Sequence, residues 1–206
     1  MSKKAKITID SYNKTAEEYY KIVTSFEVLP ELEEFMNFLQ VNDEVLDLGC
    51  GPGHHSRIFS ENGFQVTGID FSKEMINIAK KEVPEVEFHV MDILKLKFKN
   101  TCFNGVWASA SLLHVQKKLF PKALDNINNI LCDKGIFYLS LKQGKGEELL
   151  KDERYGGVNK FYSYFSSNDI ESMLKQASFK IINISSKEKR NIYDTNPWIH
   201  IFCMKN

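Results

Sequence analysis

A short glycine-rich segment has the residue types and spacing to bind a ligand. Gly49, Gly51 and Gly53 alternate within Val45–Gly53 (VLDLGCGPG), directly after an apolar run. Glycine permits a tight turn and a close approach to the bare backbone, and the helix expected behind it offers free N–H groups. Asp47, two residues before the first glycine, would repel a pyrophosphate and suits a ligand with an ammonium or sulfonium group. A plain turn after a strand is the alternative interpretation.

Two further acids follow the next two apolar runs. Asp70 closes the second run, and an acid there can accept both hydroxyls of a ribose. It could instead be an acid that favours the start of a helix near Ser72. Asp92 follows the third run, where it would lie near an adenine edge or serve only a turn. Because ligands of open α/β sheets bind at the carboxyl ends of the strands, the glycines and acids together indicate a nucleoside site.

An alternating order of elements is needed to bring these residues together. Short apolar runs indicate buried strands and amphipathic stretches indicate helices, which predicts a mostly parallel sheet with helices on both faces. Strands are expected at 44–48, 64–69, 86–90, 103–108 and 136–141, and helices at 54–61, after Ser72 and at 118–132. The closing strands, 179–184 and 198–204, lie too close in sequence for a crossover helix, so we expect an antiparallel pair.

The composition is that of a globular protein without a charge bias. The chain has 206 residues, with 27 Lys and Arg against 27 Asp and Glu, and its length fits one domain. Zero net charge disfavours a dedicated nucleic-acid-binding protein. No apolar run is long enough to span a bilayer, and no apolar stretch follows the charged N-terminus as in a secretory signal. Four scattered cysteines without a CxxC pair indicate reduced thiols in the cytoplasm, with neither disulfides nor a metal site.

The order of these motifs resembles a known enzyme family. Val45–Gly53, Val66–Ser72, Val90–Ile93 and Ile136–Leu141 are similar to the successive motifs of class I S-adenosylmethionine-dependent methyltransferases. Residues 12–19 (YNKTAEEY) resemble the Y-D-x-x-A-x-x-Y start of small-molecule members, with Asn13 where the family pattern has Asp. The resemblance implies S-adenosyl-L-methionine as cofactor. It also implies a Rossmann-like seven-stranded α/β sheet, mostly parallel, with an antiparallel last strand and helices on both faces.

The resemblance also implies which residues contact the cofactor. The glycine turn with Asp47 would surround its methionine part, Asp70 its ribose, and Asp92 its adenine. Two tyrosines near the N-terminus are expected lid contacts to its amino-acid end. The full set of expected cofactor contacts is Tyr12, Tyr19, Asp47, Gly49, Gly51, Asp70, Phe71, Asp92, Ile93 and Ala108.

The turn after the fourth strand is expected to face the methyl group. Within residues 108–115 (ASASLLHV), His114 is the one titratable side chain and is therefore a candidate catalytic base. A structural histidine, or one packed on the adenosine, is the alternative. His54 and His55 open the helix after the glycine turn and are expected to supply backbone N–H groups or solvated side chains.

The sequence is expected to form a single methyltransferase domain over residues 1–206. Its parts would be an N-terminal helical lid (1–40), a cofactor-binding core (41–141), a substrate-side insert (144–167), and a C-terminal helix with a strand pair (168–206). Arg154 and Lys160 lie in the polar, aromatic insert, where they could hold an acidic substrate but are expected in a solvated loop. The aromatic cluster at 161–165 could line an apolar pocket but is expected in the core.

The leading hypothesis for function is methyl transfer to an unidentified small-molecule acceptor (EC 2.1.1.-) by in-line displacement. The alternatives are methylation of a macromolecule, tRNA or protein, and a nucleoside-binding module without turnover. No stable nucleic-acid or membrane partner is expected, and the oligomeric state stays open. An NAD-linked oxidoreductase is disfavoured, because it predicts G-x-G-x-x-G spacing whereas the glycines here follow G-x-G-x-G.

Overall fold

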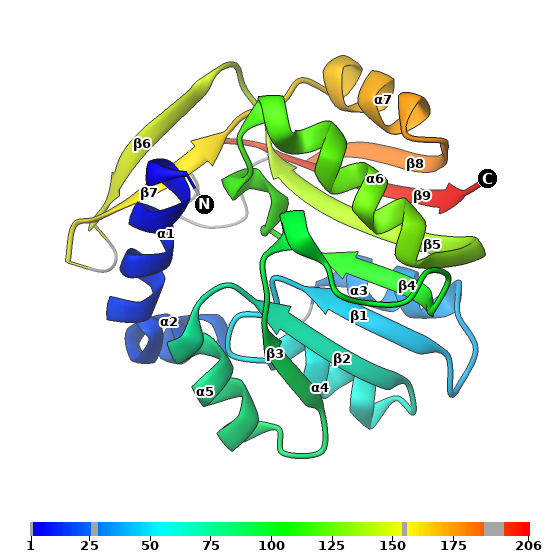
Figure 1. Cartoon of the computed structure of the whole chain (residues 1–206), viewed down its shortest axis with the longest axis horizontal. Coiled ribbons are helices and arrows are strands. Elements are labelled where there is room, and N and C mark those ends of the chain that lie inside the picture. Colours follow the sequence, from blue (N-terminus) through cyan, green and yellow to red (C-terminus); the bar gives the residue numbers. More distant parts are fainter. Residues whose placement is uncertain (1, 26–28, 154–155, 188–195) are drawn as a thin grey trace.

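A seven-stranded sheet forms the centre of the computed structural model, which describes residues 2–25, 29–153, 156–187 and 196–206. The strand order is β3-β2-β1-β4-β5-β9-β8 (Figure 1). The strands of this sheet are β1 Glu44–Leu48, β2 Gln65–Asp70, β3 Glu87–Val90, β4 Phe103–Ala108, β5 Leu131–Lys142, β8 Phe179–Lys187 and β9 Trp198–Lys205. Strands β1 to β5 pair in parallel, and β9 is antiparallel to β5 and β8. The predicted fold class and antiparallel closing pair are confirmed.

Helices cover both faces of the sheet (Figure 1). They are α1 Lys3–Lys14, α2 Ala16–Val23, α3 Pro30–Asn37, α4 His54–Glu61, α5 Lys73–Glu82, α6 Phe120–Ile130 and α7 Ser167–Gln176, with short 3-10 turns η1 Ile93–Lys95, η2 Leu112–His114 and η3 Lys117–Leu119. Helices α3 and α4 bury Phe35 and Phe59 against one face, and α6 and α7 bury Leu124 and Ile170 against the other. None of the helices in the described ranges is both long and apolar enough to cross a membrane.

Burial on two faces explains why Val45 and Leu46, successive residues of β1, are both apolar. Val45 packs with the α3 and α4 side chains, and Leu46 packs with those of α6 and α7. Successive strand residues point to opposite faces, so both neighbours must be apolar. The next helix is fixed by its cap, since the Ser72 hydroxyl accepts a hydrogen bond from the backbone N–H of Met75 at 3.2 Å.

The insert at 144–167 forms a hairpin that its polar, aromatic sequence does not indicate. Strands β6 Glu147–Asp152 and β7 Val158–Ser163 pair antiparallel as a separate two-stranded sheet. The expected solvated position of Lys160 is wrong, because its ammonium is buried against the Asp152 carboxylate at 3.1 Å. Arg154 lies outside the described residues. The four aromatic residues at 161–165 are buried, as expected for a core cluster: Phe161, Tyr162, Tyr164 and Phe165.

Strand β7 holds the first helix of the chain in place. The backbone N–H of Phe161 donates to the Thr8 hydroxyl at 3.0 Å, and the Ser11 hydroxyl donates to the Asn159 carbonyl at 2.5 Å. Helix α1 therefore lies beside the hairpin, as Figure 1 shows. These contacts place the N-terminal helices at the same edge of the sheet as the glycine turn.

Candidate functional site

The glycine turn after β1 has the left-handed backbone that its composition predicts. The φ angles are +82° at Gly49, +54° at Gly51 and +85° at Gly53. A Cβ atom at Gly49 would lie only 2.3 Å from the Ser111 Cβ, so this glycine allows two loops to pack closely. A Cβ atom at Gly51 would approach only the Tyr19 ring, at 3.7 Å, so the backbone at Gly51 faces open space. This position is where a ligand can reach bare backbone.

Asp70 ends β2 with its carboxylate beside this turn. One oxygen accepts the backbone N–H of Gly51 at 3.1 Å, and the other accepts that of Ser72 at 2.7 Å. Burial raises the pKa of Asp70 from 3.8 to about 6, while these hydrogen bonds oppose the rise. A ligand that brings positive charge or hydroxyl donors would stabilise the ionised carboxylate.

Asp47 lies beneath the glycine turn. Its carboxylate accepts the hydroxyl of Ser56, on α4, at 2.7 Å. Burial raises its pKa from 3.8 to about 7, and the charge of Asp70 adds to the rise, whereas Ser56 opposes it. Two buried acids near one turn create a region that disfavours anions and favours a cationic ligand.

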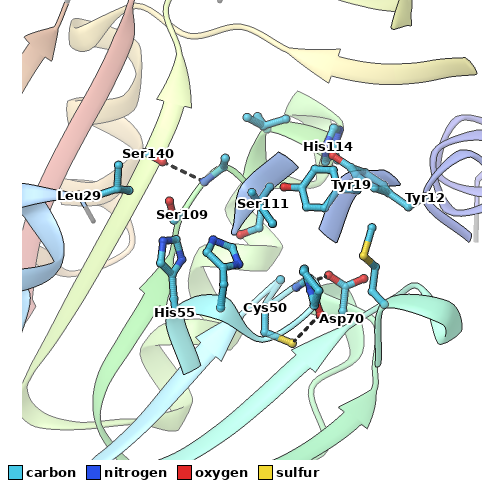
Figure 2. Close-up of a pocket in the computed structure, with 18 of the residues that line it drawn as sticks. Tyr12, Tyr19, Leu29, Cys50, His55, Asp70, Ser109, Ser111, His114 and Ser140 are labelled. Carbon is cyan, nitrogen blue, oxygen red and sulfur yellow. Dashed lines mark hydrogen bonds between the residues drawn. The ribbon is translucent and has the colours of Figure 1, made fainter. Parts of the chain in front are cut away.

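A cavity of about 440 Å³ opens above the carboxyl ends of the strands. Its described lining includes residues of α1, α2, α4, α5 and β7, the glycine turn, the end of β2 and the loop after β4. The end of β5 and the start of β9 also contribute. Tyr12 and Tyr19 meet edge to face with ring centroids 5.5 Å apart and form one wall. Figure 2 shows this pair and Asp70 on one side of the cavity, with His55, Ser109 and Ser140 across from them.

Seven of the eleven predicted site residues line this cavity, and four do not. The seven are Tyr12, Tyr19, Gly49, Gly51, Asp70, Phe71 and His114. Asp47 supports the turn from below, and Ala108 is fully buried at the end of β4. The Asp92 carboxylate accepts the backbone N–H of Leu94 at 2.9 Å and caps η1, while Ile93 packs in the core. Adenine contacts at Asp92 and Ile93 therefore stay a prediction.

Both ring nitrogens of His114 have hydrogen-bonding partners. Nδ1 lies 2.6 Å from the Phe161 carbonyl oxygen, and Nε2 lies 2.9 Å from the Tyr12 hydroxyl. A carbonyl can only accept, so Nδ1 carries the proton, and Nε2 accepts from the tyrosine. Burial lowers the pKa of His114 to about 3, and the charges of Lys160 and Lys142 lower it further, while the bond to Phe161 opposes the change. His114 is therefore a neutral imidazole that links α1 to the hairpin.

Other histidines also line the cavity. His55 accepts the indole N–H of Trp107 at its Nδ1, at 3.2 Å, and His54 packs against it with ring centroids 4.0 Å apart. Burial lowers the pKa of both rings, to about 4 for His54. Both residues line the cavity and are partly exposed, and the expected contribution of their backbone N–H groups stays a prediction. Within the described ranges, no group of three His, Cys, Asp or Glu side chains could hold a metal ion.

The far end of the cavity is lined by residues that were not among the predicted site residues. Lys142 ends β5, Trp198 begins β9, and Tyr162 comes from the hairpin. Lys142 directly follows the apolar run 136–141, so the rule that selected Asp70 would also have selected it. Tyr162 belongs to the aromatic cluster 161–165, for which a place in a pocket wall was the alternative interpretation, and this alternative is correct for Tyr162. Trp198 carried no such signal, because only the antiparallel β9 brings it to this edge.

Comparisons with known proteins agree with this arrangement. A model described as a methyltransferase domain matches residues 45–135. An O-methyltransferase of Penicillium expansum is 27% identical over 159 residues, which cover 69% of this chain and 54% of that protein. The chain spans about half the length of the first curated relatives it matches.

Solved structures share the fold at low identity. A 1,6-didemethyltoxoflavin-N1-methyltransferase of Burkholderia thailandensis, solved with S-adenosylhomocysteine, has a TM-score of 0.78 and 19% identity, over 98% of this chain and 88% of that one. The [4+2]-cyclase SpnF has a TM-score of 0.70 and 19% identity, over 85% of this chain and 79% of that one. The matched model, the sheet order and the glycine turn agree: residues 45–135 are similar to a methyltransferase domain, and the chain shares its fold with S-adenosylmethionine-dependent methyltransferases of known structure.

Proposed function

We propose that this protein transfers a methyl group from S-adenosyl-L-methionine to a small-molecule acceptor. The observation that carries the proposal is the cavity edge where Asp70 and the open backbone of Gly51 meet, joined by a 3.1 Å hydrogen bond. Its relatives named as methyltransferases support the same activity.

The residues at this edge fit the cofactor. The Asp70 carboxylate would accept the ribose hydroxyls, and the open backbone at Gly51 leaves room for the methionine part. The raised pKa values of Asp47, about 7, and Asp70, about 6, suit a ligand with positive charge. Tyr12 and Tyr19 would cover its amino-acid end from α1 and α2.

Methyl transfer depends on how the protein orients the two reactants more than on acid or base groups. S-adenosyl-L-methionine supplies a methyl group that its positive sulfur has already activated. The protein must hold an acceptor atom in line with that methyl group and exclude water, and positioning of this kind contributes up to roughly 7–11 kcal/mol. The loop of Ser109 and Ser111, with Ser140 beside it, lines the cavity where the acceptor would lie.

His114 remains the candidate base, and its surroundings favour a positioning role. Protonation at neutral pH is unfavourable because its pKa is about 3, and the Tyr12 hydroxyl occupies Nε2. Each pKa unit corresponds to about 1.4 kcal/mol, so protonating it at pH 7 costs about 5 kcal/mol. An acceptor that is already deprotonated needs no base, which fits this arrangement.

The acceptor is proposed to be small because structural elements surround the cavity. Helices α1 and α2 and strand β7 stand over the strand ends, and β7 is tied to α1 by two hydrogen bonds. A metabolite fits a cavity of about 440 Å³, and a duplex or a folded protein does not. A cytoplasmic location is also proposed, since all four cysteines are free thiols.

Calorimetry with S-adenosylmethionine and S-adenosylhomocysteine tests the cofactor assignment. We expect micromolar-range binding, no binding of NAD, and a loss of about 10- to 150-fold in Asp70→Ala, since bonds to a charged group contribute roughly 1.5–3 kcal/mol. Glu74→Gln, which removes an exposed acid from the first turn of α5, should bind as the wild type does. Unchanged affinity in Asp70→Ala would remove this residue from the site.

Turnover is tested with labelled methyl donor and a metabolite extract. Labelled small molecules are the expected result. Label in tRNA or protein alone would favour the macromolecular alternative, and cofactor binding without any transfer would favour a binding module or other chemistry on this fold.

A further inference from the structure

A histidine in the wall of the cavity has its tautomer fixed by the fold. His55, in the first turn of α4, accepts the indole N–H of Trp107 at Nδ1, over a distance of 3.2 Å. An indole nitrogen can only donate, so the neutral imidazole must carry its proton on Nε2. Burial and the neighbouring His54 ring lower the pKa of His55, and the ring therefore stays neutral at pH 7. His55 thus presents one N–H donor at Nε2.

Aromatic packing holds the indole that fixes this tautomer. Trp107 is fully buried in β4, and its ring stacks on that of Tyr138 in β5 with centroids 3.9 Å apart. The rings of Phe35 and Phe59 meet it edge to face or tilted, with centroids at 5.3 and 5.8 Å. A side chain packed in this way by three rings has little freedom to turn. The Nε2–H donor of His55 is therefore oriented before any ligand binds.

This donor lies on the acceptor side of the cavity. His55 lines the cavity and is partly exposed, and no described residue accepts a hydrogen bond from its Nε2. Figure 2 shows it with Ser109 and Ser140, across from Asp70. Its partner Trp107 belongs to β4, two strands from β2 in the order β2-β1-β4. Neighbouring strands are about 4.8 Å apart, so this side is roughly 10 Å from the edge proposed to hold the ribose.

Ser140 adds a second donor on the same side. Its Oγ accepts the backbone N–H of Ala110 at 2.9 Å, and no described residue accepts its hydroxyl hydrogen. Among the described residues that line the cavity, Asp70 alone has a carboxylate, and it lies on the opposite side. The acceptor side therefore offers N–H and O–H hydrogens to a ligand. An ammonium group has no lone pair for such donors, whereas an oxygen with two lone pairs can accept from both.

We infer that the methyl acceptor carries a carbonyl oxygen, of a ketone, an amide or a ring lactam, which accepts the Nε2–H of His55. This inference rests on the proposed function and names the substrate class for the same site. The second lone pair of the oxygen would accept the Ser140 hydroxyl. A site with fixed donors disfavours an analogue that lacks the oxygen, because the donors are then left without a partner. The carbonyl group anchors the acceptor beside β4 and leaves its nucleophilic atom to point toward the cofactor edge.

Two probes that differ only in this oxygen test the inference. Acetophenone has the carbonyl group, and α-methylstyrene has a methylene group in its place. Both are titrated by ligand-observed NMR into the full chain saturated with S-adenosylhomocysteine. A neutral hydrogen bond contributes a net factor of roughly 2- to 13-fold, so His55→Phe should lower the affinity for acetophenone relative to α-methylstyrene by that factor. His55→Gln keeps an N–H donor and should retain most of the preference.

The infrared band of the bound carbonyl group reports the hydrogen bond directly. The C=O stretching frequency of acetophenone should be lower on the wild type than on His55→Phe, because an accepted hydrogen bond weakens the C=O bond. A variant that only altered the shape of the cavity would change the affinity for both probes and leave this frequency as it is. In the ligand-free wild type, nitrogen NMR of the imidazole should show the Nε2–H tautomer, and this measurement needs no variant to fold.

Controls separate this inference from the proposed function. His89→Phe replaces a partly exposed histidine on β3, outside the described lining, and should leave both affinities and the infrared band unchanged. An Nδ1–H tautomer, no binding of acetophenone, or the same preference in His55→Phe as in the wild type would overturn the inference. A loss of S-adenosylhomocysteine affinity in His55→Phe would assign the donor to the cofactor and also overturn it. Failure of the wild type to bind S-adenosylhomocysteine would instead refute the proposed function itself.

Discussion

Replacing Asp47 by Asn should stabilise the ligand-free protein relative to the wild type, and this difference in the free energy of unfolding should grow as the pH rises. The pKa of this carboxyl group is about 7 in the folded chain against an ordinary value of 3.8. At 1.36 kcal/mol per pKa unit, ionisation therefore costs about 4 kcal/mol more in the folded state than in the unfolded state. The neutral carboxyl group contributes its full stability below pH 3.8, and that contribution is lost as the pH rises through 7.

The variant Asp47→Asn keeps a neutral side chain at every pH. Its free energy of unfolding, minus that of the wild type, should increase by about 4 kcal/mol between pH 4 and pH 8. The amide could add a constant offset through its contact with Ser56, but such an offset does not change with pH. Urea denaturation at several pH values measures the difference directly.

The control for this experiment is Asp92→Asn on the same rim. Asn caps a turn as well as Asp does, so the stability difference should be small and show no comparable rise. A difference for Asp47→Asn that is flat from pH 4 to pH 8 would refute the burial argument. The more stable Asp47→Asn should also bind S-adenosylmethionine more weakly, because stability gained at a ligand site commonly lowers function.

Three further predictions concern the turn, the lid and the histidine. Gly51→Val should abolish S-adenosylhomocysteine binding with a native circular dichroism spectrum, whereas Gly146→Val, at another left-handed position with no neighbouring atoms within 4 Å, should bind normally. If the N-terminal helices act as a lid, hydrogen exchange at residues 8–25 should slow when S-adenosylhomocysteine is added. Equal exchange with and without the ligand would contradict a lid role. His114→Gln should lower turnover by roughly 10²–10⁴-fold if the imidazole is a base. A smaller loss with an unchanged pH profile would assign it to positioning.

The elements around the glycine turn were predicted well from the sequence. β1, α4 and β4 have the bounds that the apolar runs and the glycine turn indicate. The helix expected at 118–132 is shorter, because Lys117–Leu119 forms a 3-10 turn and Leu131 already belongs to β5, where it pairs with Phe103. A local pattern cannot show that pairing with a distant strand takes residues from a helix end.

The parts that close the cavity were not predictable in the same way. Helix α1 buries Thr8 and Ser11, so its inner face has no apolar periodicity to detect. These polar side chains are buried because β7 supplies their hydrogen-bonding partners. Lys160 looked solvated for the same reason, since its carboxylate partner Asp152 becomes its neighbour only when the hairpin forms.

The bond between Thr8 and Phe161 has a consequence for synthesis. The two residues are 153 positions apart, so α1 leaves the ribosome long before its partner strand exists. At about 5–20 residues per second, the delay is roughly 8–30 s. The Rossmann-like core from β1 to β4 can assemble in that time, before β7 is available to bind α1. The glycine turn therefore takes shape before the wall that closes the cavity, and the fold is completed from this turn outward.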